Sequence, residues 1–445
     1  MNPESDTVTA SRVTTTRPDA VQRRHLLALS WGHALEWYDW ALFGLLSVYI
    51  GAAFFPADDP LASTLSALAV FAVGFAVGFA ARPIGGVILG AVADKHGRKT
   101  IMMFAVGAVA FGSFVIGVLP GYATIGVAAP IIVVLMRLLQ GVSTGIEAPL
   151  GTAYAVELVP DRPGYVAGFF AFFNNLGNLL APLSGFVISL LIGPTALGEY
   201  GWRIPFIIGG VLGLIVLWLR RTLPETLDTR AIRTIGGIPA ATGGEPSAWS
   251  GVRKYWLSVL AIIFVVGAIQ AYNYAWIAGL PNLANGTFKE DPTGVFAITT
   301  GMGVFLTLGA IVLSRILDRF AISRWFIVAR IVAIPVIFLI MLYSQPGLGG
   351  LAGVMFGGAL VLLVNMTIYN VVANSLLPQF CRGTGVGLGY GIGVALFGGT
   401  ASYLLVWLQS QGMFWVFPVY IAVLCTISVV LYVLAKRRNG LFVGN

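Results

Sequence analysis

Long apolar stretches separated by short polar loops make up most of this chain. Stretches free of Asp, Glu, Lys and Arg occur at residues 100–136, 163–198, 255–288, 331–381 and 383–435. A helix needs about 20 residues to cross the hydrocarbon core of a membrane, so the longest stretches hold two crossings each. Turn-forming residues divide them, such as Ser344 to Gly347 and Gln409 to Gly412.

The pattern predicts an all-α membrane protein whose twelve transmembrane helices lie at residues 26–54, 64–92, 100–119, 125–155, 164–192, 203–220, 255–282, 293–316, 325–343, 350–377, 384–408 and 413–435. Loops on the cytoplasmic side are enriched in Lys and Arg. All but five of the 26 Lys and Arg residues fall in the two tails or in loops that follow even-numbered helices. Both termini are therefore predicted to be cytoplasmic.

The longest predicted cytoplasmic loop lies at about residues 222–254 and is rich in Thr, Gly, Pro and Ala. This composition is typical of a linker, and the loop separates the twelve helices into two bundles of six. The predicted organisation is therefore a tail at 1–25, a six-helix bundle at 26–221, the linker at 222–254, a second six-helix bundle at 255–435 and a tail at 436–445.

Composition supports a location in the cell membrane and limits the partners. Apolar residues make up 58% of the 445 residues, charged residues 10%, and the mean hydropathy is +0.88. The net charge of +8 sits in short loop clusters, so the lipid bilayer is an expected partner and nucleic acid is not. The two cysteines, Cys381 and Cys425, form neither a disulfide framework nor a metal-site spacing. No metal or cofactor is expected.

Ionisable side chains inside the predicted first helix are candidates for function, because each costs several kcal/mol unless it faces a partner or a wet cavity. Glu36 lies about 15 Å into this helix. His33, Glu36, Trp37 and Trp40 share one face by spacing, and Asp39 is close to Glu36. Two carboxylates so placed repel, which favours proton binding by one of them. The alternative is that either acid caps or pairs with a neighbouring helix.

Three arginines lie inside predicted spans. Arg137 must stay charged and requires a carboxylate or an anionic ligand, either as a coupling partner or as a permanent ion pair. Arg82 lies in a run of glycines spaced by four residues, so it points with the packing face of its helix, toward a substrate anion or a static contact. Arg330 is close to the inner end of its span and is placed to extend toward the cytoplasmic surface.

Amide and phenol side chains at mid-depth include Asn174, Tyr272 and Asn370. They can line a substrate cavity or bond between helices, and the second use is the commoner one. Glu147 adds a third acid inside the predicted membrane region.

The loop Gly90-Ala-Val-Ala-Asp94-Lys-His-Gly97-Arg98-Lys99 resembles the signature G-x-x-x-D-x-x-G-R-[KR] between helices 2 and 3 of the major facilitator superfamily. Further stretches resemble its metabolite:proton symporter family, namely Gly32 to Trp40, Arg82 to Gly86, Arg137 to Gly141, Leu223 to Thr226 and Arg382 to Tyr390. Two places depart from the family pattern: His33 stands where the family tends to have Asn, and Gly145 to Pro149 replaces a glycine-rich stretch.

The resemblance implies the major facilitator fold of two six-helix bundles and proton-coupled symport of a small molecule by alternating access. Together with the three arginines it favours a small organic anion, such as a mono- or dicarboxylate, carried by a monomer. The expected proton-coupling residues are Glu36, Asp39, Glu147 and Arg137. The expected substrate-binding residues are Arg82, His33, Trp37, Gln140, Asn174, Tyr272 and Asn370. The expected gating residues are Gly90, Asp94, Gly97, Arg98 and Lys99.

Other functions remain open at this point. Uptake of a zwitterionic osmolyte is the alternative within the family, and a uniporter without coupling would need no titratable carboxylate. An enzyme is not expected, because the predicted spans hold one histidine and no metal-ligand spacing.

Overall fold

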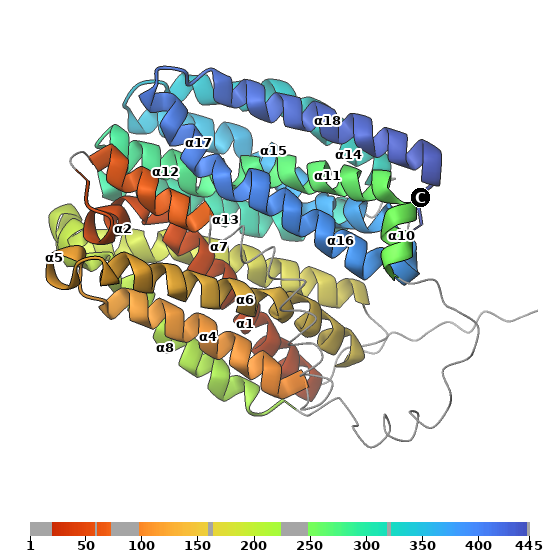
Figure 1. The fold of residues 1–445 in the computed structure, drawn as a ribbon, viewed down its shortest axis with the longest axis horizontal. Helices are drawn as coiled ribbons and strands as arrows, with labels where there is room; N and C mark the ends of the chain where they lie inside the picture. The colour runs from red at the N-terminus through yellow and green to blue at the C-terminus, as the bar shows by residue number, and fades with distance from the viewer. Residues whose placement is uncertain are drawn as a thin grey trace, which may run out of the picture.

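The computed structural model describes residues 20–57, 60–72, 98–158, 163–223, 248–317 and 322–442. These residues form helices and connecting turns, without a strand among them. Elements up to α8 occupy one half of the molecule, and elements from α10 onward occupy the other (Figure 1). The start of α1 and the end of α18 lie at the same end of the molecule (Figure 1). We call it the terminal end; it is the predicted cytoplasmic end.

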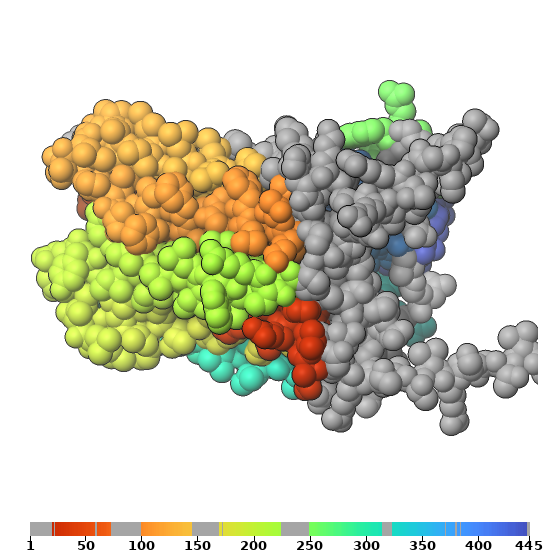
Figure 2. All heavy atoms as spheres, turned by 90° about the horizontal axis from the view of Figure 1, so that it is seen from below, coloured from red at the N-terminus to blue at the C-terminus, as the bar shows by residue number. Residues whose placement is uncertain are grey.

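The first half begins with the bent pair α1 and α2. Its described elements are α1 (Ala20–Leu45), α2 (Ser47–Phe54), the helix Pro60–Ala72, α4 (Arg98–Val118), α5 (Tyr122–Ile125), α6 (Ala128–Leu158), α7 (Pro163–Ala196), a π-helical turn at Leu197–Gly201 and α8 (Arg203–Arg220). Figure 2 shows α4 and α8 side by side on the outer face of this half. Exposed apolar side chains such as Phe111 and Trp218 cover this face, as expected of a surface in contact with lipid.

The second half begins inside the predicted linker, where α10 (Ala248–Lys254) forms a short helix. The elements that follow are α11 (Trp256–Tyr274), α12 (Leu280–Asn282) between π-helical turns at Ala275–Gly279 and Leu283–Thr287, α13 (Pro292–Leu317), α14 (Ile322–Ile337), a 3-10 helix at Phe338–Tyr343, α15 (Leu348–Ser375), α16 (Gln379–Gly393), a π-helical turn at Val394–Gly398, α17 (Gly399–Ser410) and α18 (Val416–Asn439).

The helices agree closely with the spans predicted from the charge-free stretches. Within the described ranges, nine helices are long and apolar enough to cross a membrane, or ten if the bent pair α1 and α2 is one span. The predicted span at 203–220 coincides with α8, and the span at 293–316 differs from α13 by one residue at each end. The predicted span at 64–92 is described only at Pro60–Ala72.

The first span differs from its prediction as one helix at 26–54, because α1 and α2 meet at an angle of 66°. The Ser47 hydroxyl donates hydrogen bonds to the carbonyls of Phe43, at 3.0 Å, and Gly44, at 2.8 Å. A serine bonded to the preceding turn competes with the helical ladder and bends helices. The bend lays α2 against the helix Pro60–Ala72, where a Cβ on Gly51 would lie 2.5 Å from the carbonyl oxygen of Ser63.

The two halves contact each other at the end opposite the terminal end. The Asn282 amide donates a hydrogen bond of 2.5 Å to the carbonyl of Gly44, and the Ser189 and Thr293 hydroxyls lie 2.5 Å apart. Each contact joins a first-half element, α1 or α7, to a second-half element, α12 or α13. These contacts join the described parts of the two halves on the predicted extracellular side of the molecule.

Arg220 clamps the terminal end of the first half. Its side chain is 1% exposed and donates hydrogen bonds to the carbonyls of Ala28 at 3.4 Å, Leu29 at 3.1 Å and Met102 at 3.0 Å. The guanidinium therefore ties α8 to α1 and α4. The adjacent Arg221 is exposed, and its backbone carbonyl accepts a 2.6 Å hydrogen bond from the Lys99 ammonium.

Replacing Arg220 with Met should destabilise the protein by about 3 kcal/mol, since three carbonyls lose a charged donor. The measurement is thermal unfolding of the purified protein in detergent. The matched control is Arg221→Met, which leaves the backbone bond to Lys99 intact and should shift the unfolding midpoint little. Equal shifts for the two variants would contradict the clamp.

Candidate substrate and proton site

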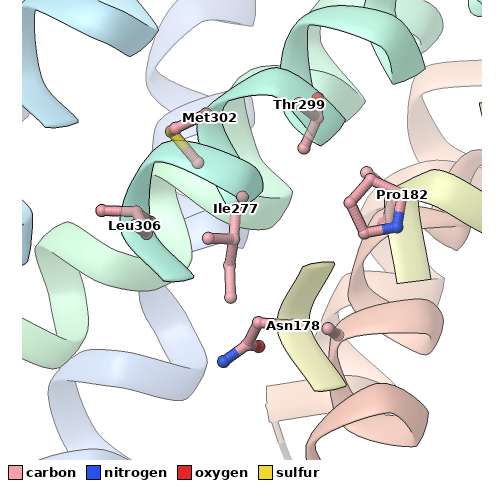
Figure 3. A pocket seen from close by; sticks show the side chains of 9 residues that line it. Asn178, Pro182, Ile277, Thr299, Met302 and Leu306 are labelled. Carbon is pink, nitrogen blue, oxygen red and sulfur yellow. The ribbon is translucent and has the colours of Figure 1, made fainter. Parts of the chain in front are cut away.

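A pocket lies between the two halves near their middle. Its walls come from α1, α7, the π-helical turn Ala275–Gly279 and α13. Figure 3 shows Asn178 and Pro182 of α7 facing Ile277, Thr299 and other side chains of the second half. The walls are mostly apolar, and the Oδ1 atom of Asn178 is buried without a hydrogen-bond partner among the described residues.

Three of the predicted substrate-binding residues continue this wall toward the terminal end. His33 and Trp37 precede the pocket residues Ala41 and Leu45 at four-residue intervals on α1, so the four share one face. On α7, Asn174 lies one turn before Asn178. The Nε1 atom of Trp37 and the Oδ1 atom of Asn174 are buried and have no partner within the described ranges. Both groups therefore retain an unused hydrogen-bonding capacity.

Close packing of α1 and α7 brings these side chains together. A Cβ on Gly177 would lie 2.3 Å from the carbonyl oxygen of Ala34 and 3.0 Å from the Cβ of Trp37, so only glycine fits there. The His33 ring lies 5.6 Å from the ring of Phe170 on α7. The wall is thus formed jointly by the two helices.

Glu36 lies beside His33 on the same turn of α1. The Nδ1 atom of His33 is 3.7 Å from the Oε2 atom of Glu36. Glu36 is 4% exposed, whereas the His33 side chain is 13% exposed. A carboxylate this deep in a membrane protein is stable only when it is protonated or paired, and His33 is the basic partner that the structure places next to it.

Asp39 faces a different neighbour, in the interior of the first half. The Nη1 atom of Arg137 lies 3.0 Å from Oδ2 of Asp39, and Nη2 donates to Oδ1 at 3.3 Å. The Ser113 hydroxyl and the Gln140 amide, the latter at 3.0 Å, also donate to Oδ1. The guanidinium lies 4.2 Å from the centre of the Phe43 ring. Both charged side chains are fully buried.

Glu36 and Asp39 therefore each have a basic partner, whereas the spacing along α1 suggested that the two acids act on each other. Gln140, predicted to bind substrate, is 0% exposed and also donates a 3.0 Å hydrogen bond to the carbonyl of Val109. In this conformation its amide nitrogen donates hydrogen bonds to Asp39 and to the backbone carbonyl of Val109. Ser113 is a member of the cluster that the sequence reasoning missed, because a single serine in an apolar helix carries no signal of its own.

The second half contributes neutral polar groups. The Gln270 amide donates to the Tyr369 hydroxyl at 3.3 Å, and that hydroxyl lies 3.5 Å from the Tyr390 hydroxyl. Asn273 donates to Gln270 at 3.5 Å. Tyr272, a predicted substrate residue, is 1% exposed and donates to the carbonyl of Gly358 at 3.1 Å, so in this conformation it joins α11 to α15.

Arg330 does not extend toward the surface, so that expectation was wrong. It is 1% exposed, and its Nη2 atom donates a 2.6 Å hydrogen bond to the carbonyl of Val265. Its guanidinium carbon lies 5.3 Å from the centre of the Phe326 ring. The packing of α14 against α15 and α18 covers it, which distance along one helix could not reveal.

The remaining candidates lie wholly or partly outside the described residues. Arg82 and the gating residues Gly90, Asp94 and Gly97 belong to the segment 73–97. Arg98 begins α4, Glu147 lies within α6 and Asn370 within α15, but their side chains are not described. Across the described ranges, no three or more His, Cys, Asp or Glu side chains are placed to hold a metal ion.

Buried charges inside two membrane-embedded helical halves define a multi-pass membrane transport protein rather than an enzyme. A sequence model described as the Major Facilitator Superfamily matches residues 29–390. The chain belongs to this superfamily, as its motifs indicated.

Curated relatives extend over nearly the whole chain. The chain is 32% identical over 441 residues to the alpha-ketoglutarate permease of Escherichia coli strain K12, covering 97% of this chain and 98% of the permease. It is 31% identical over 418 residues to a proline/betaine transporter of Salmonella typhimurium, covering 90% of this chain and 81% of that protein. Both relatives are transporters by name, which confirms transport as the class of function and the cell membrane as the location.

Solved structures confirm the predicted fold class. A crystal structure of a D-xylose-proton symporter has a TM-score of 0.72 at 18% identity, covering 93% of this chain and 97% of that one. An inward-open structure of the xylose transporter XylE from E. coli has a TM-score of 0.67 at 17% identity, covering 94% of this chain and 96% of that one. At this identity the likeness concerns the fold alone.

Asp39 and Arg137 should be energetically coupled. Arg137→Gln leaves a buried carboxylate without its ionic partner and should cost about 3–5 kcal/mol. The double variant Asp39→Asn with Arg137→Gln removes both charges, so it should cost less than the sum of the single variants by more than about 1 kcal/mol. Unfolding in detergent measures the cycle, and additive costs would refute the pairing.

Proposed function

We propose that this protein is a proton-coupled symporter of a small organic anion, such as a mono- or dicarboxylate, that works by alternating access. The observation that carries the proposal is the pair of His33 and Glu36, 3.7 Å apart, in which His33 lies on the α1 face that continues into the pocket between the halves. A titratable carboxylate at this depth has a functional role by default.

Proton binding follows from the burial of Glu36. When the halves move and water reaches the carboxylate, the charged form is favoured; when the site closes, the protonated form is favoured unless His33 is charged. Asp39 with Arg137 is the second proton-coupling candidate and Glu147 the third. Because Asp39 accepts hydrogen bonds from Ser113 and Gln140 besides its ion pair, its release from Arg137 requires a rearrangement of α1 against α6.

An anionic substrate is supported by the basic side chains of the first half and by the relatives. Arg82 and His33 are the proposed contacts for carboxylate groups, with Trp37, Asn174, Tyr272, Asn370 and Gln140 as further candidates. The alignment with the alpha-ketoglutarate permease covers 97% of this chain and 98% of the permease. The proline/betaine transporters support a second candidate, a zwitterionic osmolyte, and the neutral groups Gln270 and Tyr369 suit either substrate.

Gating at the terminal end is proposed for Gly90, Asp94, Gly97, Arg98 and Lys99. Lys99 lies at the terminal end of the first half, where its ammonium donates a hydrogen bond to the Arg221 carbonyl. The driving force is the proton gradient, without a cofactor, and the proposed functional unit is the monomer.

Proteoliposomes should accumulate α-ketoglutarate when the outside is more acidic than the inside, and a protonophore should abolish the accumulation. Glu36→Gln should stop accumulation but keep counterflow exchange of substrate, because the amide cannot carry the proton. The matched control, Glu199→Gln, changes an exposed acid at the opposite end and should transport normally. Undiminished accumulation by Glu36→Gln would refute the proton role, and accumulation of betaine instead would favour the osmolyte.

A further inference from the structure

His33 and Glu36 form a pair whose members differ in exposure. Their side chains are 13% and 4% exposed, respectively, and the two residues lie three positions apart on one turn of α1. The His33 ring is flanked by the rings of Trp37, at 6.5 Å, and Phe170, at 5.6 Å. The more accessible member of the pair is therefore the basic one, held in place by aromatic rings.

The described charged side chains on elements packed against α1 are matched or remote. Of the described side chains on elements packed against α1, Arg137 on α6 pairs with Asp39, and Arg220 on α8 bonds carbonyls at the terminal end. Arg203 bonds the Leu119 carbonyl at the opposite end of α8. α7 contains no Asp, Glu, Lys or Arg, and neither does the turn Ala275–Gly279. The Lys99 ammonium on α4 donates a hydrogen bond to the Arg221 carbonyl. On α2, the titratable side chain is that of Tyr49.

We propose that the substrate carboxylate takes the place of Glu36 as the partner of His33, and that Glu36 then carries the co-transported proton. This inference rests on the proposed function and names its exchange step. In the empty site, protonated His33 faces the Glu36 carboxylate, and the pair is neutral. In the loaded site, protonated His33 faces the substrate carboxylate, while Glu36 holds one proton taken from water.

The exchange couples transport of the proton to transport of the substrate because each offsets the charge of the other. A carboxylate that enters without a proton leaves the site with one excess negative charge, which a poorly hydrated interior opposes. A proton that enters alone adds one positive charge to the pair, which is opposed for the same reason. For each carboxylate that His33 binds, one proton on Glu36 leaves the charge of the site unchanged, and both leave together when His33 returns to Glu36. The indole Nε1 of Trp37 and the Asn174 amide oxygen remain to orient the rest of the molecule.

Proton uptake on binding tests this exchange. Purified protein in weakly buffered detergent solution is titrated with α-ketoglutarate, and a pH indicator reports protons taken up. The wild type should take up about one proton per molecule bound, so its affinity should fall as pH rises. Binding of α-ketoglutarate without proton uptake would overturn the exchange without any variant. No binding of α-ketoglutarate, succinate or acetate would remove the proposed anion transport as well.

Variants separate the roles of the two side chains. His33→Asn should weaken α-ketoglutarate binding by roughly tenfold or more, whereas His33→Lys, which keeps a cation, should restore both binding and proton uptake. The double variant His33→Lys with Glu36→Gln should bind α-ketoglutarate but take up no proton. His25→Asn, at the terminal end of α1, is the matched control and should behave as the wild type.

A merely structural role for His33 gives different results. His33→Asn would then bind α-ketoglutarate with the wild-type affinity and the wild-type pH profile, and transport would still be coupled. That outcome would overturn the exchange while leaving proton-coupled anion transport in place. Continued uptake of a proton by the double variant would overturn it equally, because the proton would then reside on another group.

Discussion

Charges in a membrane interior must be neutralised or hydrogen-bonded, and this constraint organises the described helices of the first half of the protein. Asp39 lies against Arg137 with Ser113 and Gln140 completing its hydrogen bonds, so helices α1, α4 and α6 meet around one ion pair. Arg220 meets the same constraint with backbone carbonyls instead of an acid. The ion pair that stabilises this packing also lies one turn from Glu36, the carboxylate that we propose to carry the proton.

Glycine at helix contacts decides where side chains can converge. Gly177 lets α7 approach the backbone of α1 so closely that a Cβ would clash with the Ala34 carbonyl. This approach places Asn174 beside the face of α1 that carries His33 and Trp37. A polar wall therefore arises at a point where two apolar helices touch, and close packing rather than an open cavity defines its geometry.

The described parts of the two halves divide the chemistry unequally. The first half supplies the ionisable groups Glu36, Asp39 and Arg137, whereas the second supplies the amides and phenols of Gln270, Tyr369 and Tyr390. Neutral groups keep their hydrogen-bonding character as a proton comes and goes, so they suit recognition of a substrate skeleton. In the proposed mechanism, charge and proton change within the first half, where the helices of a single bundle can respond to them.

The sequence by itself determined the helical membrane fold, the superfamily and most helix boundaries, because charge-free length and turn residues are local properties that one chain displays directly. It also identified Glu36, Asp39 and Arg137 as unusual, since a charge inside an apolar stretch is visible without a structure. Tertiary packing decided which partner each charge has. Asp39 meets Arg137, Glu36 meets His33, and Arg330 is enclosed by its neighbours. Ser47 bends the first span because its hydroxyl donates hydrogen bonds to carbonyls of the preceding helical turn. Ser113, on a third helix, donates a hydrogen bond to Asp39 of the ion pair. Partners and bends depend on how helices approach one another in space, which spacing along one helix does not specify.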